Sequence, residues 1–144
     1  VEHVKLIVDS NNGSINLNLN AKNPFINGNS NHLENIIINI LDNAVKYSKA
    51  SPFINVSTKN IDDNLEVCIQ DNGIGMDKNT QKMVFEKFYR EQNGDIHDIK
   101  GHGLGLSYVK KIVDFHKGKI SLESKKGSGT KFYINIKTLT NENK

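Results

Sequence analysis

The sequence predicts an α+β fold: a two-layer α/β sandwich with three helices on one face of a mixed, mostly antiparallel sheet. Helical and strand periodicities alternate along the chain without an internal repeat, and most expected strands follow one another as hairpin pairs. With 144 residues, 36% of them apolar, the chain can build one hydrophobic core, whereas two cores would each be too small. We therefore expect a single domain over residues 1–144.

The first part of the chain is expected to form a short helix followed by strands. Apolar residues over 4–7 suggest a short opening helix. Over residues 15–20 apolar residues alternate with asparagine, which predicts a half-buried strand. Residues 25–26 suggest a second, brief strand.

A long helix is expected to begin at Ser30 or Asn31, whose side-chain oxygen can cap the first-turn amides. It runs to about Tyr47, and we expect Pro52 to stop it. At about 100° per residue its apolar side chains fall in one sector that must face the core. That sector contains Leu33, Ile37, Ile40, Leu41, Ala44 and Val45.

The opposite side of this helix carries a polar stripe of Asn35, Asn39, Asn43 and Lys46. A solvated face is the ordinary explanation, but such faces favour Glu, Lys and Gln, and asparagine is a poor helix former. Amide oxygens suit Mg²⁺, which takes one or two protein oxygens together with substrate phosphates. Lys46 is then placed to neutralise phosphate, and Tyr47 either lies against a base or is simply half-buried at the helix end.

The second half of the chain alternates in the same way. The elements expected are strands over 53–59 and 65–70 joined by a turn over 60–64, a helix over 78–88, a mobile loop over 91–100, a helix over 104–116 ended by Gly118, and a closing hairpin of 120–122 and 132–136 around Gly127 and Gly129. Helices combined with hairpin-connected strands give the two layers of the predicted sandwich.

Composition and charge exclude several classes of protein. The formal charge of +3 comes from scattered basic residues, which argues against a nucleic-acid-binding surface. Cys68 is the only cysteine, so we expect neither an intramolecular disulfide nor a cysteine zinc site, and we predict a reducing, cytoplasmic setting for this domain. The longest aliphatic run, over 36–38, is far shorter than the roughly 20 residues that span a bilayer. Because the chain begins with Val1 rather than methionine, we expect it to be part of a longer protein.

Asp71 comes directly after the strand expected over 65–70 and opens the segment Asp71-Asn-Gly73-Ile-Gly75-Met76. A carboxylate at a strand end can accept a hydrogen bond from the exocyclic amine of adenine, while glycines let the backbone approach the ring. A plain Asp-Asn-Gly turn is the alternative. An EF-hand loop is excluded, because Gly73 and Gly75 stand where oxygen-bearing side chains are needed.

The segment Gly101-His-Gly103-Leu-Gly105-Leu opens a helix, so its free amides and the positive helix end form a natural phosphate cradle. It is not a dinucleotide fingerprint, because its spacing is GxGxG and a polar loop precedes it. The chain contains no GxxxxGK[ST] phosphate loop. Thr130, beside the closing hairpin turn, can face the same site or can simply belong to that turn.

Phe85, Phe88 and Tyr89 lie at helical spacing directly before the polar loop. Aromatic residues at this spacing usually pack in a core. Here they are also placed to anchor a lid, over about residues 86–104, that closes over nucleotide. Arg90 then reaches phosphate from the lid, or else is an ordinary surface charge.

The order and spacing of residues 39–47, 71–76, 85–90 and 101–106 resemble the N box, first glycine box, F box and second glycine box of sensor histidine kinases. These boxes belong to the ATP-binding catalytic domain, a Bergerat fold shared with gyrase, Hsp90 and MutL. The resemblance covers nearly the whole chain, with one departure where Asn29 replaces a common aspartate. It implies that ATP and Mg²⁺ are the ligands.

The resemblance also implies a role for each matching residue. It implies that Asn43 binds Mg²⁺ with support from Asn39, and that Lys46 and Arg90 act with them on the phosphates. The nucleotide-binding residues that it implies are Tyr47, Asp71, Gly73, Gly75 and Met76 near adenine, Phe88 at the lid, and His102, Gly103, Leu104, Gly105, Leu106 and Thr130 toward the phosphates and the pocket wall.

Asn39 stands where gyrase-like relatives carry a general-base glutamate, and an amide cannot take a proton from water. The resemblance therefore favours phosphoryl transfer over hydrolysis. None of the five histidines lies in a His-Glu-Leu-Arg-Thr-Pro-like acceptor motif, so the implied partners are a separate dimerisation domain with the acceptor histidine and a downstream response regulator. The alternatives are a nucleotide-responsive binding module without transferase activity and an ATP-hydrolysing clamp of the gyrase type.

Overall fold

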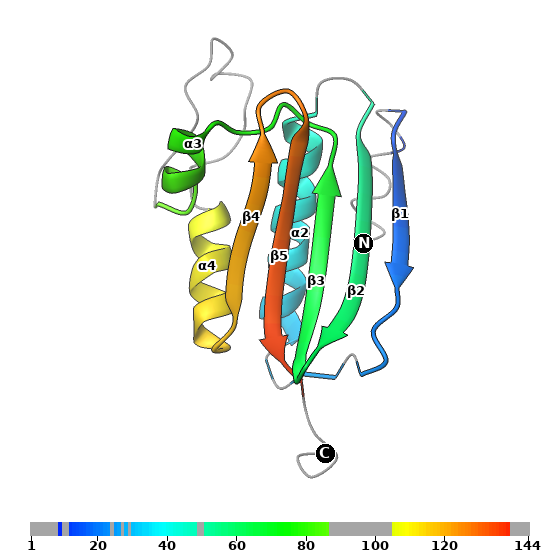
Figure 1. The fold of residues 1–144 in the computed structure, drawn as a ribbon, viewed down its shortest axis with the longest axis vertical. Coiled ribbons are helices and arrows are strands. Elements are labelled where there is room, and N and C mark those ends of the chain that lie inside the picture. The colour runs from blue at the N-terminus through cyan, green and yellow to red at the C-terminus, as the bar shows by residue number, and fades with distance from the viewer. Residues whose placement is uncertain are drawn as a thin grey trace.

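A five-stranded sheet with helices packed on one of its faces forms the domain (Figure 1). The structure, a computed structural model, describes residues 9, 12–23, 25, 26, 28, 30–48, 51–86 and 105–138. The strands are β1 (Ser14–Leu19), β2 (Phe53–Ile61), β3 (Asn64–Asp71), β4 (Lys119–Lys125) and β5 (Gly129–Lys137), and the helices are α2 (Ser30–Lys46), α3 (Lys78–Met83) and α4 (Gly105–Phe115).

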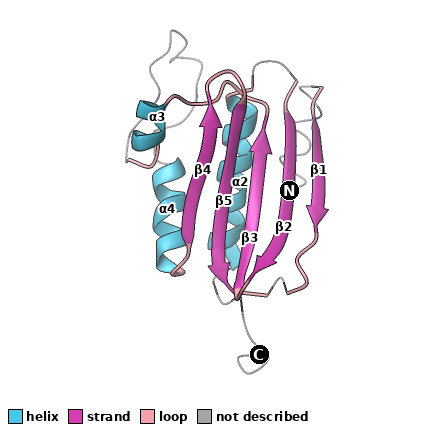
Figure 2. Ribbon diagram, in the orientation of Figure 1, coloured by secondary structure: helices cyan, strands magenta, loops and turns pink. Residues whose placement is uncertain are grey.

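The sheet order is β1-β2-β3-β5-β4. Only β1 and β2 are parallel, and the other neighbouring strands are antiparallel. Figure 2 shows α2 and α4 on the same side of the sheet. The predicted α+β sandwich with a mixed, mostly antiparallel sheet is therefore confirmed.

The hydrophobic core lies between the helices and the sheet. Strand pairing places Val56, Ile69 and Phe132 opposite one another on adjacent strands, so they share the face that the helices cover. Burying a side chain of this size contributes about 1.5–3 kcal/mol. The core contains Ile36, Ile40, Leu41, Ala44, Ile54, Val56, Ile69, Leu106, Val109, Val113, Phe132, Ile134 and Ile136. The predicted sector of the long helix is correct except that it omitted Ile36.

Pro52 does not stop the long helix, contrary to the prediction. The last turn of α2 is closed by Ser48, whose backbone N and Oγ both donate to the carbonyl oxygen of Val45, at 3.3 and 2.8 Å. Pro52 is buried, and its carbonyl accepts from the N–H of Ser14 at 2.9 Å. Pro52 thus helps to start the parallel β1–β2 pairing instead.

The β2–β3 hairpin is longer and its turn tighter than the predicted turn over 60–64. The strands continue to Ile61 and resume at Asn64. Asp62 has a φ of 53°, the left-handed conformation that suits a two-residue hairpin turn. The local polar composition hid this pairing, because an asparagine-rich strand end resembles a loop.

Two further elements are shorter than predicted. The helix expected over 78–88 ends as α3 at Met83. Residues 25–26 form no strand, and Ile26 makes only an isolated bridge with Thr138. Short segments of this kind lack the length over which periodicity is informative.

Lys117, and not Gly118, takes the left-handed conformation at the end of α4, with a φ of 58°. The N–H of Gly118 donates to the carbonyl of Val113 at 2.9 Å, which closes the helix end. A Cβ on Gly118 would lie 2.5 Å from the carbonyl oxygen of Asn135. Glycine is therefore needed for close approach to β5 rather than for its φ.

β1 is less buried than predicted. Leu17 and Leu19 are 50% and 63% exposed. Their register with Val56 and Thr58 places them on the helix side of the sheet. However, β1 is the edge strand, and the described helices pack nearer to β3 and β4. Among the described residues nothing covers these two leucines fully.

Several predicted features lie outside the described residues. They are the opening helix over 4–7, the loop over 91–100, and the predicted lid beyond Glu86. Within the described part of the chain, no helix is long and apolar enough to cross a membrane.

We expect Leu41→Ala to lower the free energy of unfolding by about 2–5 kcal/mol, because Leu41 is 0% exposed and its removal leaves a cavity in the core. Urea unfolding checks this value. Leu19→Ala on the exposed edge strand is the control, and its effect should be much smaller. Equal losses in the two variants would contradict the assignment of the core.

Candidate functional site

Asp71, the last residue of β3, carries a carboxylate that is partly buried. Its Oδ1 accepts hydrogen bonds from the N–H groups of Gly73, at 2.8 Å, and Thr130, at 3.2 Å. Burial raises the pKa of the Asp71 carboxyl, and these two hydrogen bonds offset the rise only in part. Both bonds end on Oδ1, so Oδ2 has no hydrogen bond from the described residues. Oδ2 can therefore accept a hydrogen bond from a ligand.

The segment that follows Asp71 lies close to two neighbouring pieces of backbone. The N–H of Ile74 donates to the carbonyl of Tyr47 at 3.0 Å, and a Cβ on Gly73 would lie 2.6 Å from the same oxygen. Gly75 has a φ of 71°, and a Cβ there would collide with the carbonyl of Lys125. The two predicted glycines are thus required by close approach to the end of α2 and to the β4–β5 hairpin.

Ser124 and Gln81 hold the same segment, and the sequence analysis missed both. The N–H of Met76 donates to Ser124 Oγ at 2.8 Å, and Gln81 Nε2 donates to the carbonyls of Met76 and Ser124, at 2.9 and 3.1 Å. Ser124 Oγ donates to the carbonyl of Gly129 at 2.9 Å and lies 2.8 Å from Thr130 Oγ1. Thr130 is therefore part of this network. No local pattern signals such contacts, because strand register brings the partners together.

The exposure of the polar stripe of α2 differs along the helix, and its last member, Lys46, is exposed. Asn35 is exposed, whereas Asn39 and Asn43 are half-buried. Asn39 Nδ2 donates to the carbonyl of Asn35 at 2.7 Å, and this bond orients the amide and its Oδ1. A Cβ on Gly105 would lie 3.3 Å from this oxygen. The first residue of α4 therefore lies beside the predicted metal-binding stripe.

Other predicted residues have structural contacts. Lys46 forms an ion pair with Asp42 at 3.1 Å on the surface of α2. Phe85 packs edge-on against Phe132, with ring centroids 6.4 Å apart, as the core interpretation predicted. The side chain of Leu106 belongs to the core.

The described part of the site gathers at one end of the molecule. β3 ends and β5 begins at the upper end of the sheet in Figure 1, where α2 also ends. No described residues form a group of three or more His, Cys, Asp or Glu that could hold a metal. Five predicted site residues lie outside the described part: Phe88, Arg90, His102, Gly103 and Leu104.

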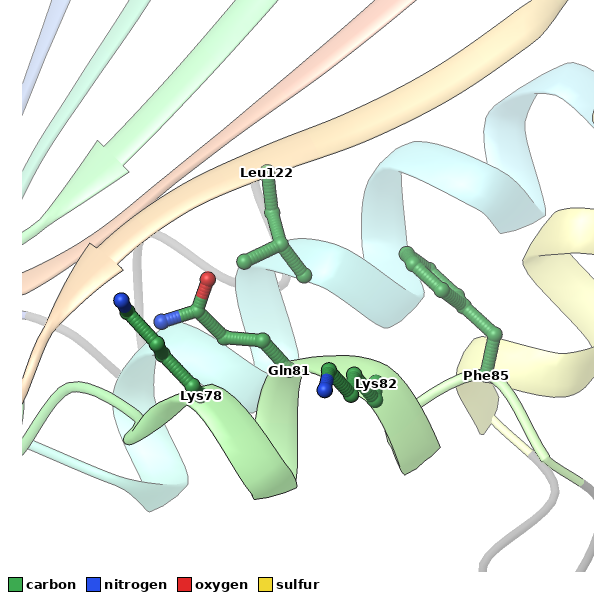
Figure 3. Close-up of a pocket in the computed structure, with 5 residues that line it drawn as sticks. All are labelled: Lys78, Gln81, Lys82, Phe85 and Leu122. Carbon is green, nitrogen blue, oxygen red and sulfur yellow. The ribbon is translucent and has the colours of Figure 1, made fainter.

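A separate pocket of about 340 Å³ lies between α3 and β4 (Figure 3). Lys78, Gln81 and Lys82 line it from α3, Phe85 follows that helix, and Leu122 comes from β4. None of the predicted nucleotide-binding residues lines this pocket. The pocket is connected to the site through Gln81, whose amide extends toward β4 in Figure 3.

Comparison with known proteins gives consistent matches. The family model described as histidine kinase-, DNA gyrase B- and HSP90-like ATPase matches residues 28–140. The sensor protein RprX of Bacteroides fragilis (strain YCH46) is 50% identical over 139 residues, which cover 95% of this chain and 27% of that protein. The chain thus spans about a quarter of the length of this relative.

Solved structures agree with these matches. The mycobacterial sensor histidine kinase MprB is 28% identical, with a TM-score of 0.77 over 94% of this chain and 87% of that chain. Full-length ShkA in complex with AMPPNP is 22% identical, with a TM-score of 0.82 over 96% of this chain and 29% of that chain. At 22% identity, the likeness to ShkA shows the fold alone.

We expect Gly75→Ala to destabilise the chain more than Gly127→Ala. Both glycines have positive φ, 71° and 90°, which costs an L-residue about 1–2 kcal/mol. A Cβ on Gly127 meets nothing within 4 Å, whereas one on Gly75 collides with the hairpin backbone. Gly75→Ala should lower the free energy of unfolding by about 1–3 kcal/mol more than Gly127→Ala does, as measured by urea unfolding. Equal losses would show that the close approach is unimportant.

Proposed function

Because the chain belongs to the family of histidine kinase-, DNA gyrase B- and HSP90-like ATPases, we propose that its ATP site presents the γ-phosphate to a histidine on a separate domain. The chain is an ATP-binding catalytic domain of the sensor histidine kinase type. The acceptor belongs to the dimerisation domain of the same full-length protein, and a response regulator takes the phosphoryl group from it. The observation that carries the proposal is the partly buried Asp71 carboxylate with one oxygen left for a ligand. Since ATP is supplied in the cytoplasm, we place the domain there.

Adenine recognition rests on Asp71. Its Oδ2 accepts from the exocyclic amine, while the N–H groups of Gly73 and Thr130 hold Oδ1 and so fix the carboxylate plane. Hydrogen bonds to a charged acceptor are worth about 1.5–3 kcal/mol. The absence of side chains at Gly73 and Gly75 lets the backbone approach the purine, with Tyr47 and Met76 beside it.

Phosphate and Mg²⁺ binding rest on the two half-buried asparagines of the α2 stripe. The fixed Oδ1 of Asn39 and the amide of Asn43 one turn later supply the hard neutral oxygens that Mg²⁺ accepts alongside waters and phosphates. When bound, Mg²⁺ neutralises charge on the phosphates. Lys46 can leave Asp42 for a phosphate at little cost, because an exposed ion pair contributes about 0–1 kcal/mol.

Transfer rather than hydrolysis follows from the chemistry of Asn39. Its amide has no basicity near neutral pH and cannot activate water. The remaining residues position the phosphates and neutralise their charge, which is what phosphoryl transfer requires of a protein. The N-terminus of α4 at Gly105 contributes the positive end of the helix dipole. We propose that residues 101–106 hold the phosphates, with Arg90 acting from the lid and His102 through its amide.

The test combines the chain with labelled ATP, Mg²⁺ and the histidine-bearing dimerisation domain of its own full-length protein. We expect acid-labile phosphohistidine on that domain and slow ATP hydrolysis by the chain alone. Asn43→Ala should reduce transfer about tenfold or more by removing a metal ligand, because tenfold corresponds to about 1.4 kcal/mol. Asn35→Ala is the matched control, since it leaves the backbone carbonyl that Asn39 uses. Tight ATP binding without phosphohistidine would indicate a binding module, and rapid hydrolysis would indicate a gyrase-type ATPase.

Asp71→Asn should weaken ATP binding by about tenfold or more, because the charged acceptor for the adenine amine is lost. It should not lower the free energy of unfolding at neutral pH. Burial raises the pKa of Asp71, so the folded chain binds its proton more tightly than the unfolded chain does. Its contribution to stability is therefore greatest below the unfolded pKa and is lost as pH rises through the raised folded pKa. The variant should lack this pH dependence.

Titration calorimetry and urea unfolding at acid and neutral pH check these two expectations. Asp114→Asn, on the exposed side of α4, is the control and should leave ATP affinity unchanged. Unaltered affinity in Asp71→Asn would exclude the adenine-binding role.

A further inference from the structure

We propose that Ser124 determines the preference for adenine over guanine by fixing the direction of the Thr130 hydroxyl. The inference rests on the proposed nucleotide site and deepens it. Ser124 makes no contact with the base in this proposal, so it is a positioning residue that acts through Thr130.

The hydrogens of the two hydroxyl groups can be assigned from their partners. Ser124 Oγ has one hydrogen, which it donates to the carbonyl of Gly129 at 2.9 Å, while it accepts from the N–H of Met76 at 2.8 Å. With that hydrogen used, we assign the hydrogen of Thr130 to the bond between Ser124 Oγ and Thr130 Oγ1, at 2.8 Å. The Thr130 hydroxyl consequently has only lone pairs left to offer.

Strand register places this hydroxyl beside the adenine-reading carboxylate. Ser124 lies opposite Thr130 in the β4–β5 pairing, and the N–H of Thr130 donates to Asp71 Oδ1 at 3.2 Å. The polar side chains that lie side by side on β4, β5 and β3 therefore offer a ligand two acceptors, the Thr130 oxygen and Asp71 Oδ2. Neither has a hydrogen to give while the carboxylate is ionised.

A row of acceptors discriminates between the purines. At the same ring position adenine carries an amine, which donates, whereas guanine carries a carbonyl, which accepts. A guanine carbonyl would face lone pairs and find no donor, directly or through one bridging water. Polar groups that a wrong substrate leaves unpaired are the main source of strong discrimination.

Ser124 is held firmly enough for this role. Gln81 ties the backbone carbonyl of Ser124 to that of Met76, and Figure 3 shows the Gln81 side chain extending from α3 toward β4. Thr130 is only 5% exposed, so bulk water does not readily replace the bond from Ser124. Without Ser124 Oγ, the Thr130 hydroxyl is free to rotate and donate to a guanine carbonyl.

The test is the ratio of ATP to GTP affinity, measured by titration calorimetry on folded variants. Ser124→Ala should lower this ratio roughly fivefold or more, the effect of losing about one oriented hydrogen bond. Ser124→Thr keeps the hydroxyl and should restore the ratio. Ser121→Ala, on the exposed face of the same strand, is the matched control and should leave the ratio unchanged. A loss of both affinities by the same factor in Ser124→Ala would show a merely structural role and overturn the proposal.

Thr130→Val tests the role of the Thr130 hydroxyl while Ser124 is unchanged. It is the deciding variant if Ser124→Ala does not fold. It should lower the ratio as well, and Ser124→Ala in that background should lower it no further. An unchanged ratio in Thr130→Val, or additive effects in the double variant, would overturn the proposal. Wild-type chain that binds neither nucleotide would overturn the proposed function itself. If instead the wild type binds ATP and the Ser124 variants keep its preference for ATP over GTP, only the proposal about Ser124 is overturned.

Discussion

The site depends on close backbone approach around the end of β3. Gly73, Gly75 and Gly129 each stand where a Cβ would meet a carbonyl oxygen of another segment. Because no side chains separate these segments, the end of α2, the turn after β3 and the β4–β5 hairpin are fixed relative to one another. Asp71 lies at their junction, and its orientation follows from amides that these segments supply.

This arrangement favours ligand binding over stability of the free chain. Burial of Asp71 raises its pKa, so an ionised carboxylate at neutral pH is a cost that the two backbone amides offset only in part. A ligand amine that donates to the remaining oxygen stabilises the charged form further. On the proposed function, adenine binding regains part of the free energy that is lost in folding the empty site, as is common at functional sites.

Sequence reasoning succeeded where one element determines the outcome. Apolar periodicity found the buried face of α2, and the position of Asp71 at the end of a strand follows from alternation alone. It failed where two elements must meet. Ser124 and Gln81 bind backbone groups of other segments, and Pro52 proved to be a sheet contact rather than a helix stop. Such contacts depend on register and on packing, which no local pattern encodes.

The proposed choice between phosphoryl transfer and hydrolysis depends on how Asn39 is held on α2. Asn39 is oriented by donating from Nδ2 to the carbonyl of Asn35 at 2.7 Å, and this bond directs Oδ1 toward Gly105. A glutamate at this position would have no hydrogen to donate and would place its charge against that carbonyl oxygen. It would therefore have to turn away from the position that Asn39 now holds. A general base for hydrolysis needs a different setting on this helix as well as a different residue, so the proposed preference for transfer depends on the carbonyl of Asn35 as well as on the side chain of Asn39.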